Sequence, residues 1–521
     1  MINPASSPTE ATRWQRRGGW AALLGLALVF ALAPRVWNLS GSYEHLDEEQ
    51  VLCVNQRLWN QPGWDTDWAK ADMHPAFRDF HYQFVSYHYA AHFFTRMVRP
   101  LVPAEVFAAR RQLIVLRLFS ALCGAAGVGF VLLLGRQVAG PAGAAGAFLL
   151  YTLNPALVQD AHYARPDAFM TCLALGVAWL CLAPPGRGRW RLGAASALVG
   201  VLVASKITCG LLAVLPAWLV LRAGWREGWK TAAPLVALAP AGFLVGVVLG
   251  MPFAIAHFNL YLSDMTLQLA IYGGSHPPHN LVSGGALWPL LRDYFLAVHG
   301  GLLFALAVGG GVWFAWYRRW DELVMLVLPA VFCIIYFARQ RVFFERNLCF
   351  VLPFLFVAAA AAAVALGRVL APRTGSPWVA GALALLLAVM AALPGARMTD
   401  RLVCVALDDQ EIIRERARQE QALAPVAAGL QEWYTFGTSD PVPKLLARFG
   451  RSEQPPVLIG FNDYNDDYFR RGWPDLRNRL IGEEVYLQRG AFWDLPVCTL
   501  NVYHGAKVHF LLVTGVRSSE F

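Results

Sequence analysis

Apolar runs of membrane-spanning length constrain this chain more than any other feature. About 20 consecutive apolar residues form a helix that crosses the roughly 30 Å hydrocarbon core of a bilayer. Such runs lie between charged residues at 18–36, 118–135, 141–157, 168–184, 231–251, 294–317, 323–338, 347–367 and 377–396. Of the 521 residues, 57% are hydrophobic and 15% are charged, far from a soluble composition. The sequence therefore predicts a polytopic membrane protein.

The stretch 192–221 needs separate treatment, because it carries a single charge, Lys206, and is too long for one ordinary span. Basic residues flank both of its ends, and basic flanks favour the cytoplasmic side. We therefore expect a hairpin that turns near Lys206, which brings the total to about eleven helices. The tail 1–17 is then cytoplasmic, the membrane domain covers 18–396, and 397–521 lie outside. The first span is expected to be a retained helix, since it lacks a small-residue cleavage site.

The net charge of +9 does not indicate a nucleic-acid partner, because the basic residues come in short clusters between apolar runs. In the predicted topology these clusters share one side, and all twelve histidines fall on the other. The nine cysteines show no metal-ligand spacing, so most are interpreted as small buried hydrophobic residues. The Ala-, Gly- and Arg-rich composition is typical of a bacterial inner membrane, where membrane lipids are the surrounding partner.

Two long loops, 39–110 and 252–293, lie on the outer side of this topology. In the first, His81, Val85, His88 and His92 recur at helical intervals, which predicts a helix in the membrane interface. The second has a similar amphipathic stretch closed by a Gly/Pro turn. Beyond 397 a polar helix at 400–432 and strand-like segments at 455–462, 483–488 and 507–515 predict a small extracytoplasmic α/β domain.

Charged residues gather at the outer ends of the predicted helices. Asp47 and Glu48 follow the first span, and Arg165 and Asp167 occupy the turn "YARPDAFM". The two short helices that flank Lys206 place it below the outer hydrocarbon boundary. A buried cation costs about 2.5–3.5 kcal/mol near the bilayer centre, and is usually retained beside a cavity or an anion.

Three arginines in "FARQRVFFERN", Arg339, Arg341 and Arg346, lie on the side that should be poor in positive charge. Each one alone could extend to lipid phosphates, and the acidic run at 47–49 alone could be a solvated patch. Taken with Lys206, however, the arginines favour a specific anionic ligand held in the membrane. Arginine matches phosphate geometry with two hydrogen bonds, so a phosphate is the expected anion.

Four segments together resemble membrane glycosyltransferases of the GT-C superfamily, the group of the protein O-mannosyltransferases and lipid A aminoarabinose transferases. They are the Asp-Glu pair at 47–48, "YARPDAFMTCLALG", "ASKITCGLLAVLPAWL" and "ERNLCFVLPFLFVAAAA". The resemblance covers roughly residues 15 to 400. Each motif is short, but the four occur in the order expected for the superfamily and lie on the same predicted side of the membrane. It implies transfer of a sugar, usually with inversion, from a polyprenyl-phosphate donor to a lipid, glycan or protein acceptor on the outer face.

The resemblance also implies roles for individual residues. Asp47 is the implied catalytic base, with Glu48 as its neighbour in the motif. Arg165 and Asp167 match the second-loop motif, and Lys206 and Arg346, with Arg341 close by, match positions near the donor phosphate. Bacterial relatives carry "YPP" or "KPPL" in the first loop, where this chain has "HYQF" and "MHPAFRDF". His81, Tyr82 or His74 is expected to replace that contact.

The residue types suit this chemistry independently of the resemblance. Fixed cations stabilise the negative charge that develops on a departing phosphate, and a carboxylate can take the acceptor proton. No cofactor is required. His88 and His92 lie four residues apart near acidic groups, so a divalent metal stays an alternative that nothing else in the sequence supports.

Two other functions stay open at this point. A transporter or flippase for a lipid-linked substrate would also need membrane-depth cations, but it predicts charges near the midplane and often related halves. The predicted apolar cores are nearly free of charge, and no internal repeat stands out. A non-catalytic scaffold of the same fold is the third alternative, and the intact Asp-Glu pair argues only mildly against it.

Overall fold

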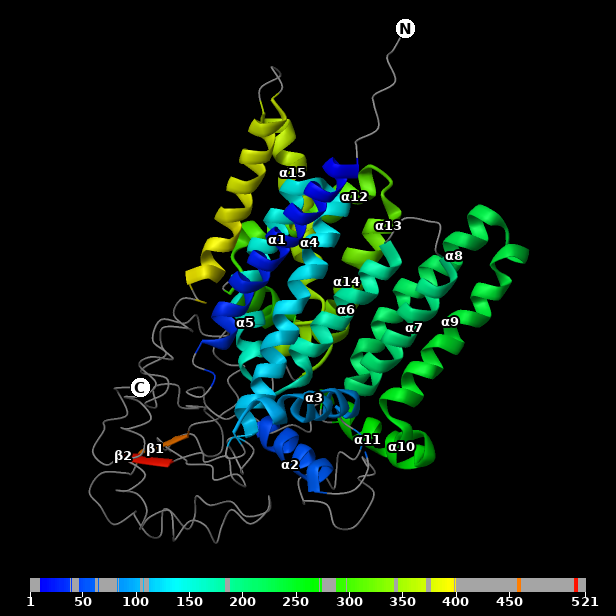
Figure 1. Ribbon diagram of the computed structural model, residues 1–521, viewed down its shortest axis with the longest axis vertical. Coiled ribbons are helices and arrows are strands. Elements are labelled where there is room, and N and C mark those ends of the chain that lie inside the picture. Colours follow the sequence, from blue (N-terminus) through cyan, green and yellow to red (C-terminus); the bar gives the residue numbers. More distant parts are fainter. Residues whose placement is uncertain are drawn as a thin grey trace.

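The computed structural model describes residues 10–37, 39, 46–60, 64, 82, 84–103, 106, 112–182, 188–270, 272–273, 287–296, 298–341, 345–371, 376–397, 399, 457–460 and 510–513. Within these residues the protein is a bundle of long helices with shorter helices gathered at one end (Figure 1). Six of the described helices are long and apolar enough to cross a membrane, or seven if one bent pair counts as a single span. The prediction of a multi-pass helical membrane protein is therefore confirmed, whereas the total of eleven helices stays a prediction.

The long helices make up the body of the bundle. They are α1 (Glu10–Val36), α4 (Gln112–Thr152), α6 (Pro166–Leu182), α7 (Gly188–Ser205), α8 (Val214–Glu227), α9 (Trp229–Gly250), α12 (Gly301–Trp316), α14 (Leu328–Ala338), α15 (Leu352–Leu370) and a last helix, Pro377–Arg397. The short α13 (Trp320–Glu322) and the π-helical η9 (Leu323–Val327) lead into α14.

The shorter helices include α2 (Leu46–Asn60), α3 (Val85–Val98), α5 (Pro155–His162), α10 (Pro252–Ala256) and α11 (Phe258–Ala270). In Figure 1, α2, α3, α10 and α11 lie together at the end of the bundle opposite the turn between α8 and α9. Short 3-10 or π-helical pieces complete the described helices: η2 (Arg99–Leu101), η5 (Ile207–Ala213), η8 (Pro289–Leu296) and η10 (Glu345–Leu348).

The long α4 consists of two helices joined by a sharp reversal. This agrees with the prediction of two separate spans at 118–135 and 141–157. Gly140 has φ 77° and ψ −166°, and Pro141 follows it. Only glycine adopts this conformation without strain, and the next proline cannot donate a backbone hydrogen bond to the preceding turn. After the reversal, the Tyr151 hydroxyl donates to the carbonyl oxygen of Gly124 at 2.8 Å. The two halves therefore pack against each other.

The stretch 192–221 also breaks where the sequence predicts. Lys206 has an extended backbone (φ −155°, ψ 123°) between α7 and η5, which continues into α8. The Lys206 N–H still donates to the carbonyl of Leu202 at 2.9 Å, and the Lys206 carbonyl accepts from the Cys209 N–H at 2.9 Å. The break therefore falls at the one charged residue of the stretch, and two helical segments replace one long span.

The predicted span 294–317 is wrong at its start. Its first residues belong to η8, and α12 begins only at Gly301 after a bend of 104° between the two pieces. Gly300 lies at the bend with φ 85°, a conformation that favours glycine. Similarly, α15 begins at Leu352 rather than 347, so Arg346 lies in the separate turn η10.

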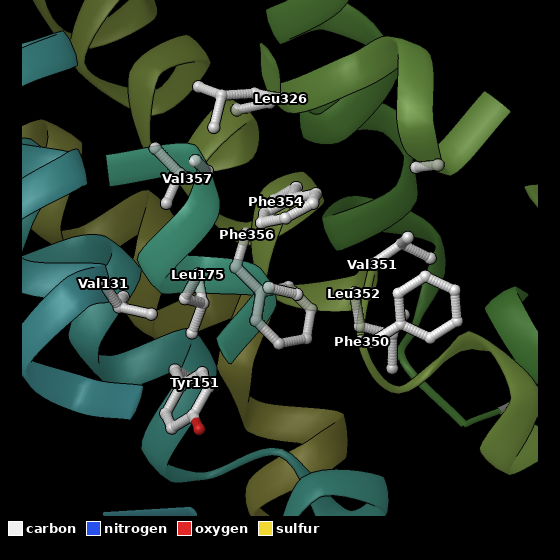
Figure 2. Close-up of a cluster of buried hydrophobic side chains, with 14 of the residues drawn as sticks. Val131, Tyr151, Leu175, Leu326, Phe350, Val351, Leu352, Phe354, Phe356 and Val357 are labelled. Carbon is white, nitrogen blue, oxygen red and sulfur yellow. The ribbon is translucent and has the colours of Figure 1, made fainter. Parts of the chain in front are cut away.

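The apolar core of the bundle is built around α15. Phe354, Phe356 and Val357 of α15 face Val131 and Tyr151 of α4, Leu175 of α6 and Leu326 of η9 (Figure 2). All seven side chains are at most 1% exposed. Removing a buried aromatic side chain of this kind typically destabilises a protein by about 3–5 kcal/mol. The core thus fixes α15, and with it the turn η10 that precedes it.

The first helix is tied to this core by a buried arginine. Arg35, in the last turn of α1, is completely buried. Its guanidinium donates to the carbonyl of Ala31 at 2.7 Å and to that of Tyr151 at 3.2 Å. Carbonyls at a helix end carry partial negative charge, which stabilises a nearby cation. The positive charge therefore joins the end of α1 to the end of α4.

The helix predicted from the histidine spacing is confirmed as α3, whereas its position in the membrane interface stays a prediction. Val85, His88 and His92 of α3 are at most 2% exposed, and α3 contacts α2, α4 and α7. Their spacing therefore reflects packing against the protein, which the periodicity alone cannot distinguish from packing against lipid. His81 lies outside the described residues.

Two strands lie inside the predicted carboxyl-terminal domain. The strands β1 (Val457–Gly460) and β2 (Phe510–Val513) pair antiparallel, with Val457 opposite Val513. They coincide with the predicted strand segments 455–462 and 507–515, whereas 400–432 and 483–488 lie outside the described residues. The α/β domain as a whole stays a prediction. Of the membrane cysteines, Cys181 and Cys333 are buried and Cys123 and Cys172 are partly buried, as their apolar surroundings predict.

Candidate functional site

The first charged cluster is centred on Glu48 in the first turn of α2, and its carboxylate is 1% exposed. Nε and Nη2 of Arg117, from the start of α4, donate to its two oxygens at 2.8 Å each. The backbone N–H of Ala164 donates to Oε1 at 2.6 Å, and Arg117 also donates to the Leu39 carbonyl at 2.7 Å. Glu48 thus joins α2 to α4 and to the turn before α6. Asp47 precedes it in the same helical turn, and its side chain lies outside the described part of the chain.

The second cluster is the turn between α5 and α6, where Arg165 is held between two carboxylates. Nη2 of Arg165 lies 2.7 Å from Asp160 Oδ1, and Nε lies 3.5 Å from Asp167 Oδ2. All three residues are at most 4% exposed. The guanidinium also lies over the ring of Tyr163, 4.8 Å from its centroid. Two carboxylates around one arginine leave a net negative charge here, which favours another cation nearby.

The local sequence explains this turn. Pro166 begins α6, because its fixed φ suits the first helical position and its missing N–H is not needed there. The residue before a proline avoids helical geometry, so Arg165 lies outside the helix. Asp167 falls in the first turn of α6, where the partial positive charge of the helix amino terminus stabilises a carboxylate. The Arg-Pro-Asp order therefore places both charges at the amino-terminal end of α6.

The third cluster contains Lys206, which is partly buried at the break between α7 and η5. Its Nζ donates to Oδ1 of Asn347 in η10 at 2.5 Å, and Nδ2 of Asn347 donates to the Tyr272 hydroxyl at 3.0 Å. Lys206 also interacts electrostatically with Asp167 and with Arg346. Three segments far apart in sequence, at 206, 272 and 345–348, therefore meet at one lysine.

A continuous series of contacts links the three clusters. Glu48 binds the backbone at Ala164, and the next residue, Arg165, pairs with Asp167. The Cys349 thiol lies 3.7 Å from both the carbonyl and Oδ1 of Asp167. Cys349 follows the η10 turn that holds Arg346 and Asn347. The helix α2, the α5–α6 turn, the Lys206 break and η10 thus form one neighbourhood.

The remaining predicted site residues are placed as follows. Arg346 is partly buried in η10, whereas Arg341 has an exposed side chain and uses its N–H to donate to the Tyr272 carbonyl at 3.2 Å. Tyr82 is 3% exposed, and its N–H donates to Asp264 Oδ2 of α11 at 3.1 Å. Tyr82 packs with Val54, Ala204 and Met251 in a separate apolar cluster. Tyr82 therefore joins the two outer loops.

The histidine pair of α3 is engaged in protein contacts. Nδ1 of His92 lies 2.9 Å from Asn55 Oδ1, and Nε2 accepts a hydrogen bond from Nε of Arg96 at 3.0 Å. Burial, with the Arg96 charge beside it, lowers the pKa of His92 to about 4. Among the described residues, no group of three or more His, Cys, Asp or Glu side chains is arranged to hold a metal ion.

Four residues of this neighbourhood are not predicted from the sequence: Arg117, Asp160, Asn347 and Tyr272. Asp160 follows the span 141–157 and could have been found by the search for outer charges, since it lies five residues from Arg165. Arg117 could have been found as a basic residue at the outer end of α4. Asn347 and Tyr272 carry no charge, so no sequence signal distinguishes them from other polar residues.

Comparison with known proteins shows a family similarity over part of this region. Residues 104–252 match the family model described as dolichyl-phosphate-mannose-protein mannosyltransferase. The match covers the Arg165 turn and the Lys206 break. A search of curated proteins gave no match.

Several solved structures are similar to the chain. ArnT from Cupriavidus metallidurans, bound to undecaprenyl phosphate, is 17% identical over 87% of this chain and 85% of that chain, with a TM-score of 0.47. The same protein in the apo state is 18% identical over 88% and 85%, also with a TM-score of 0.47. The archaeal oligosaccharyltransferase AglB from Archaeoglobus fulgidus, in complex with an inhibitory peptide and a dolichol-phosphate, is 15% identical over 75% of this chain and 56% of that chain, with a TM-score of 0.46.

The family match falls on two of the four segments that carry the sequence resemblance. It therefore agrees with the resemblance of these two segments to the membrane glycosyltransferases of the GT-C superfamily.

Proposed function

We propose that the protein transfers a sugar from a polyprenyl-phosphate-linked donor to a hydroxyl or phosphate acceptor. The proposed reaction takes place on the extracytoplasmic face of a membrane, which in a bacterium is the inner membrane. The observation that carries the proposal is the convergence of Lys206, Arg346 and Asn347 beside the Arg165–Asp167 turn. Cations at this depth are expected beside an anion. The family model that matches residues 104–252 describes enzymes whose donor is a lipid-linked phosphosugar.

In the proposed reaction, Lys206 and Arg346 bind the donor phosphate before transfer. The bond between the sugar C1 and the phosphate oxygen then breaks, and its electron pair stays on the phosphate. The product phosphate carries more negative charge than the donor, so the two fixed cations stabilise the products and the transition state that resembles them. Because the cations are already in place, little reorganisation is needed at the moment of reaction.

Asp47 is the proposed general base. The acceptor oxygen attacks C1 from the face opposite the phosphate, and this attack inverts the configuration at C1. At the same time the acceptor proton passes to the Asp47 carboxylate. General base catalysis of this type contributes about 10²- to 10⁴-fold in rate. Glu48 is better suited to a supporting role, because Arg117 and the Ala164 N–H already occupy both of its oxygens. We assign it to placing the first turn of α2, and Asp47 with it, beside the Arg165 turn.

The test uses Asp47→Asn in membranes that contain the full-length protein. We expect loss of sugar transfer by about 10²-fold or more, with normal membrane insertion and normal binding of a polyprenyl phosphate. The assay uses cells that lack the chromosomal gene and produce either the wild-type protein or the variant. It measures how much radiolabelled sugar passes from the membrane lipids into the acceptor fraction. Cells without an active protein should accumulate the unused donor lipid, and analysis of that lipid identifies the sugar.

Wild-type transfer activity in Asp47→Asn would remove Asp47 from the mechanism. A transporter would instead move the labelled lipid across the membrane with its sugar still attached, so recovery of intact labelled lipid in the outer leaflet would favour that alternative.

A further inference from the structure

The strongest unexplained feature of the site is the partner of Lys206. Its ammonium donates to Asn347 Oδ1 at 2.5 Å, although the charged group of a lysine that is largely removed from solvent is usually paired with a carboxylate. Asp167 is near enough to interact electrostatically with Lys206 but is itself 3.5 Å from Arg165. The hydrogen bond of the ammonium is therefore to a neutral amide.

Asn347 is itself held in one orientation. Its Nδ2 donates to the Tyr272 hydroxyl at 3.0 Å, which leaves Oδ1 to face Lys206. Tyr272 is fixed in turn, because its carbonyl accepts from the Arg341 N–H at 3.2 Å and its ring lies 6.4 Å from that of Phe337. Asn347 is 1% exposed. The amide can therefore not turn its nitrogen toward Lys206 without losing the bond to Tyr272.

A neutral partner has a specific electrostatic consequence. A carboxylate at this distance would neutralise the ammonium and repel an incoming phosphate. An amide oxygen occupies one of the three N–H donors of lysine and positions the group, but it adds no negative charge of its own to oppose an incoming anion. The arrangement thus suits a lysine that must stay fixed and charged before its ligand arrives.

We infer that Asn347 and Tyr272 are positioning residues for a phosphate-binding Lys206, with Tyr272 orienting the amide and Asn347 holding the ammonium without neutralising it. This inference rests on the proposed function, because it takes a lipid-linked phosphate as the ligand of Lys206. It adds that the second outer loop, through Tyr272, controls how strongly that phosphate is bound.

The experiment measures the dissociation constant of undecaprenyl phosphate for the detergent-solubilised full-length protein, from the rise in unfolding temperature with ligand concentration. Asn347→Asp keeps the shape of the side chain but adds a negative charge 2.5 Å from Lys206. We expect it to weaken binding by about tenfold or more, the usual effect of altering a contact to a charged group. Asn347→Ala removes the contact but adds no charge, so we expect about threefold. Tyr272→Phe should weaken binding by about twofold to threefold, since only the orientation of the amide is lost.

The order of the two Asn347 variants is the decisive result. If Asn347 only filled space, the isosteric Asp would bind better than Ala, and that order would overturn the inference. Asn55→Asp is the matched control, because Asn55 is also buried and hydrogen-bonded but contacts His92 and Thr95. It should leave binding unchanged even if it lowers the unfolding temperature.

A double-variant comparison separates this inference from the proposed function. Lys206→Ala should weaken binding by about tenfold or more, and adding Asn347→Ala to it should cause no further loss, because Asn347 acts through Lys206. Unchanged binding in Lys206→Ala would contradict the proposed phosphate site itself. Weakened binding in Lys206→Ala, with an additive loss from Asn347→Ala, would overturn only the positioning role. If Asn347→Asp does not fold, wild-type binding in Tyr272→Phe would also overturn that role.

Discussion

The buried ion pairs of this protein have a different energetic meaning from ion pairs on a surface. Glu48 and Arg117 are 1% and 3% exposed at their side chains, so both charges have lost most of their contact with solvent. The pair and its additional bonds to Ala164 and Leu39 offset that desolvation. The pair as a whole can therefore add little net stability, yet the loss of one member leaves an uncompensated charge.

We predict that Glu48→Ala lowers the stability of the protein by about 3–5 kcal/mol, because Arg117 then remains charged and buried. The measurement is the midpoint of unfolding in detergent. The control is Glu322→Ala, which breaks the Arg319–Glu322 pair at side chains that are 25% and 21% exposed. A partly solvated pair is worth about 1 kcal/mol or less. Equal losses in the two variants would contradict the structural role given to Glu48.

At the scale of elements, glycines decide how closely the helices approach. On the α7–α9 pair, a Cβ at Gly246 would overlap the carbonyl oxygen of Ala197, and one at Gly200 would overlap the carbonyl oxygen of Phe243. Small residues are enriched at helix contacts in membranes because they let backbones pack directly. Since α7 ends just before Lys206 and α9 leads into α10 and α11, this contact also sets the spacing between Lys206 and these two short helices.

We predict that Gly246→Ala destabilises the protein by about 1–3 kcal/mol, since the added methyl group must push α7 and α9 apart. The control is Gly25→Ala in α1, where a Cβ meets no atom within 4 Å. There, alanine should be neutral or stabilising by about 0.5–1 kcal/mol through its better helix propensity. Unfolding midpoints of both variants in the same detergent test the difference, and a neutral Gly246→Ala would show that the two helices can separate freely.

The histidines of α3 give this helix a pH-dependent stability. Burial lowers the pKa of His92 to about 4 and that of His88 to about 3, whereas an unfolded histidine has a pKa of about 6.5. Between these values the unfolded chain binds protons that the folded chain does not. Stability is therefore complete above about pH 6.5 and falls as the pH is lowered.

We predict that the unfolding temperature decreases as the pH is lowered from 6.5 to 5, by the equivalent of roughly 1 kcal/mol or more for each buried histidine. His92→Gln should give a shallower pH dependence than the wild type, whatever its effect at neutral pH. Thermal unfolding at several pH values measures both slopes. An unchanged slope in His92→Gln would mean that this histidine protonates as readily in the folded state as in the unfolded state.

The whole molecule has two chemically different ends. Figure 1 places α2, α3, α10 and α11 at one end and the turn between α8 and α9 at the other. The basic turn contains Arg226 and Lys230, and basic turns favour the cytoplasmic side. The buried charges of the candidate site lie near the first end, between α2, α5, α6 and η10. This arrangement favours chemistry on the non-cytoplasmic side.

We predict that a cysteine at His257, between α10 and α11, reacts with a membrane-impermeant maleimide in intact cells, whereas a cysteine at Arg226 reacts only after lysis. Both native side chains are exposed, so accessibility depends on the side of the membrane and not on burial. Labelling of the wild-type protein gives the background from its own cysteines. The reverse pattern would invert the topology and move the proposed reaction to the cytoplasm.

The sequence by itself determined the membrane class, the positions of most helices and the list of charged residues near the site. These follow from local physical rules: the length of an apolar run, the breaking effect of Gly140–Pro141, and the cost of the single charge Lys206 within an apolar stretch. The same rules did not predict the bend before Gly301 inside the expected span 294–317, because the apolar run continues on both sides of the bend. They predicted the helix α3 but not its packing against α2, α4 and α7, since a buried face and a lipid-facing face have the same periodicity.

Only the tertiary structure decided which of these charges act together. The pairing of Glu48 with Arg117 spans 69 residues, and the contact of Lys206 with Asn347 spans 141. No local pattern encodes such contacts, because they depend on how α4, α7 and α15 pack in three dimensions. The neutral partners Asn347 and Tyr272 were beyond sequence reasoning for the same reason. Their importance comes from the charge that the fold places beside them and not from their own chemistry.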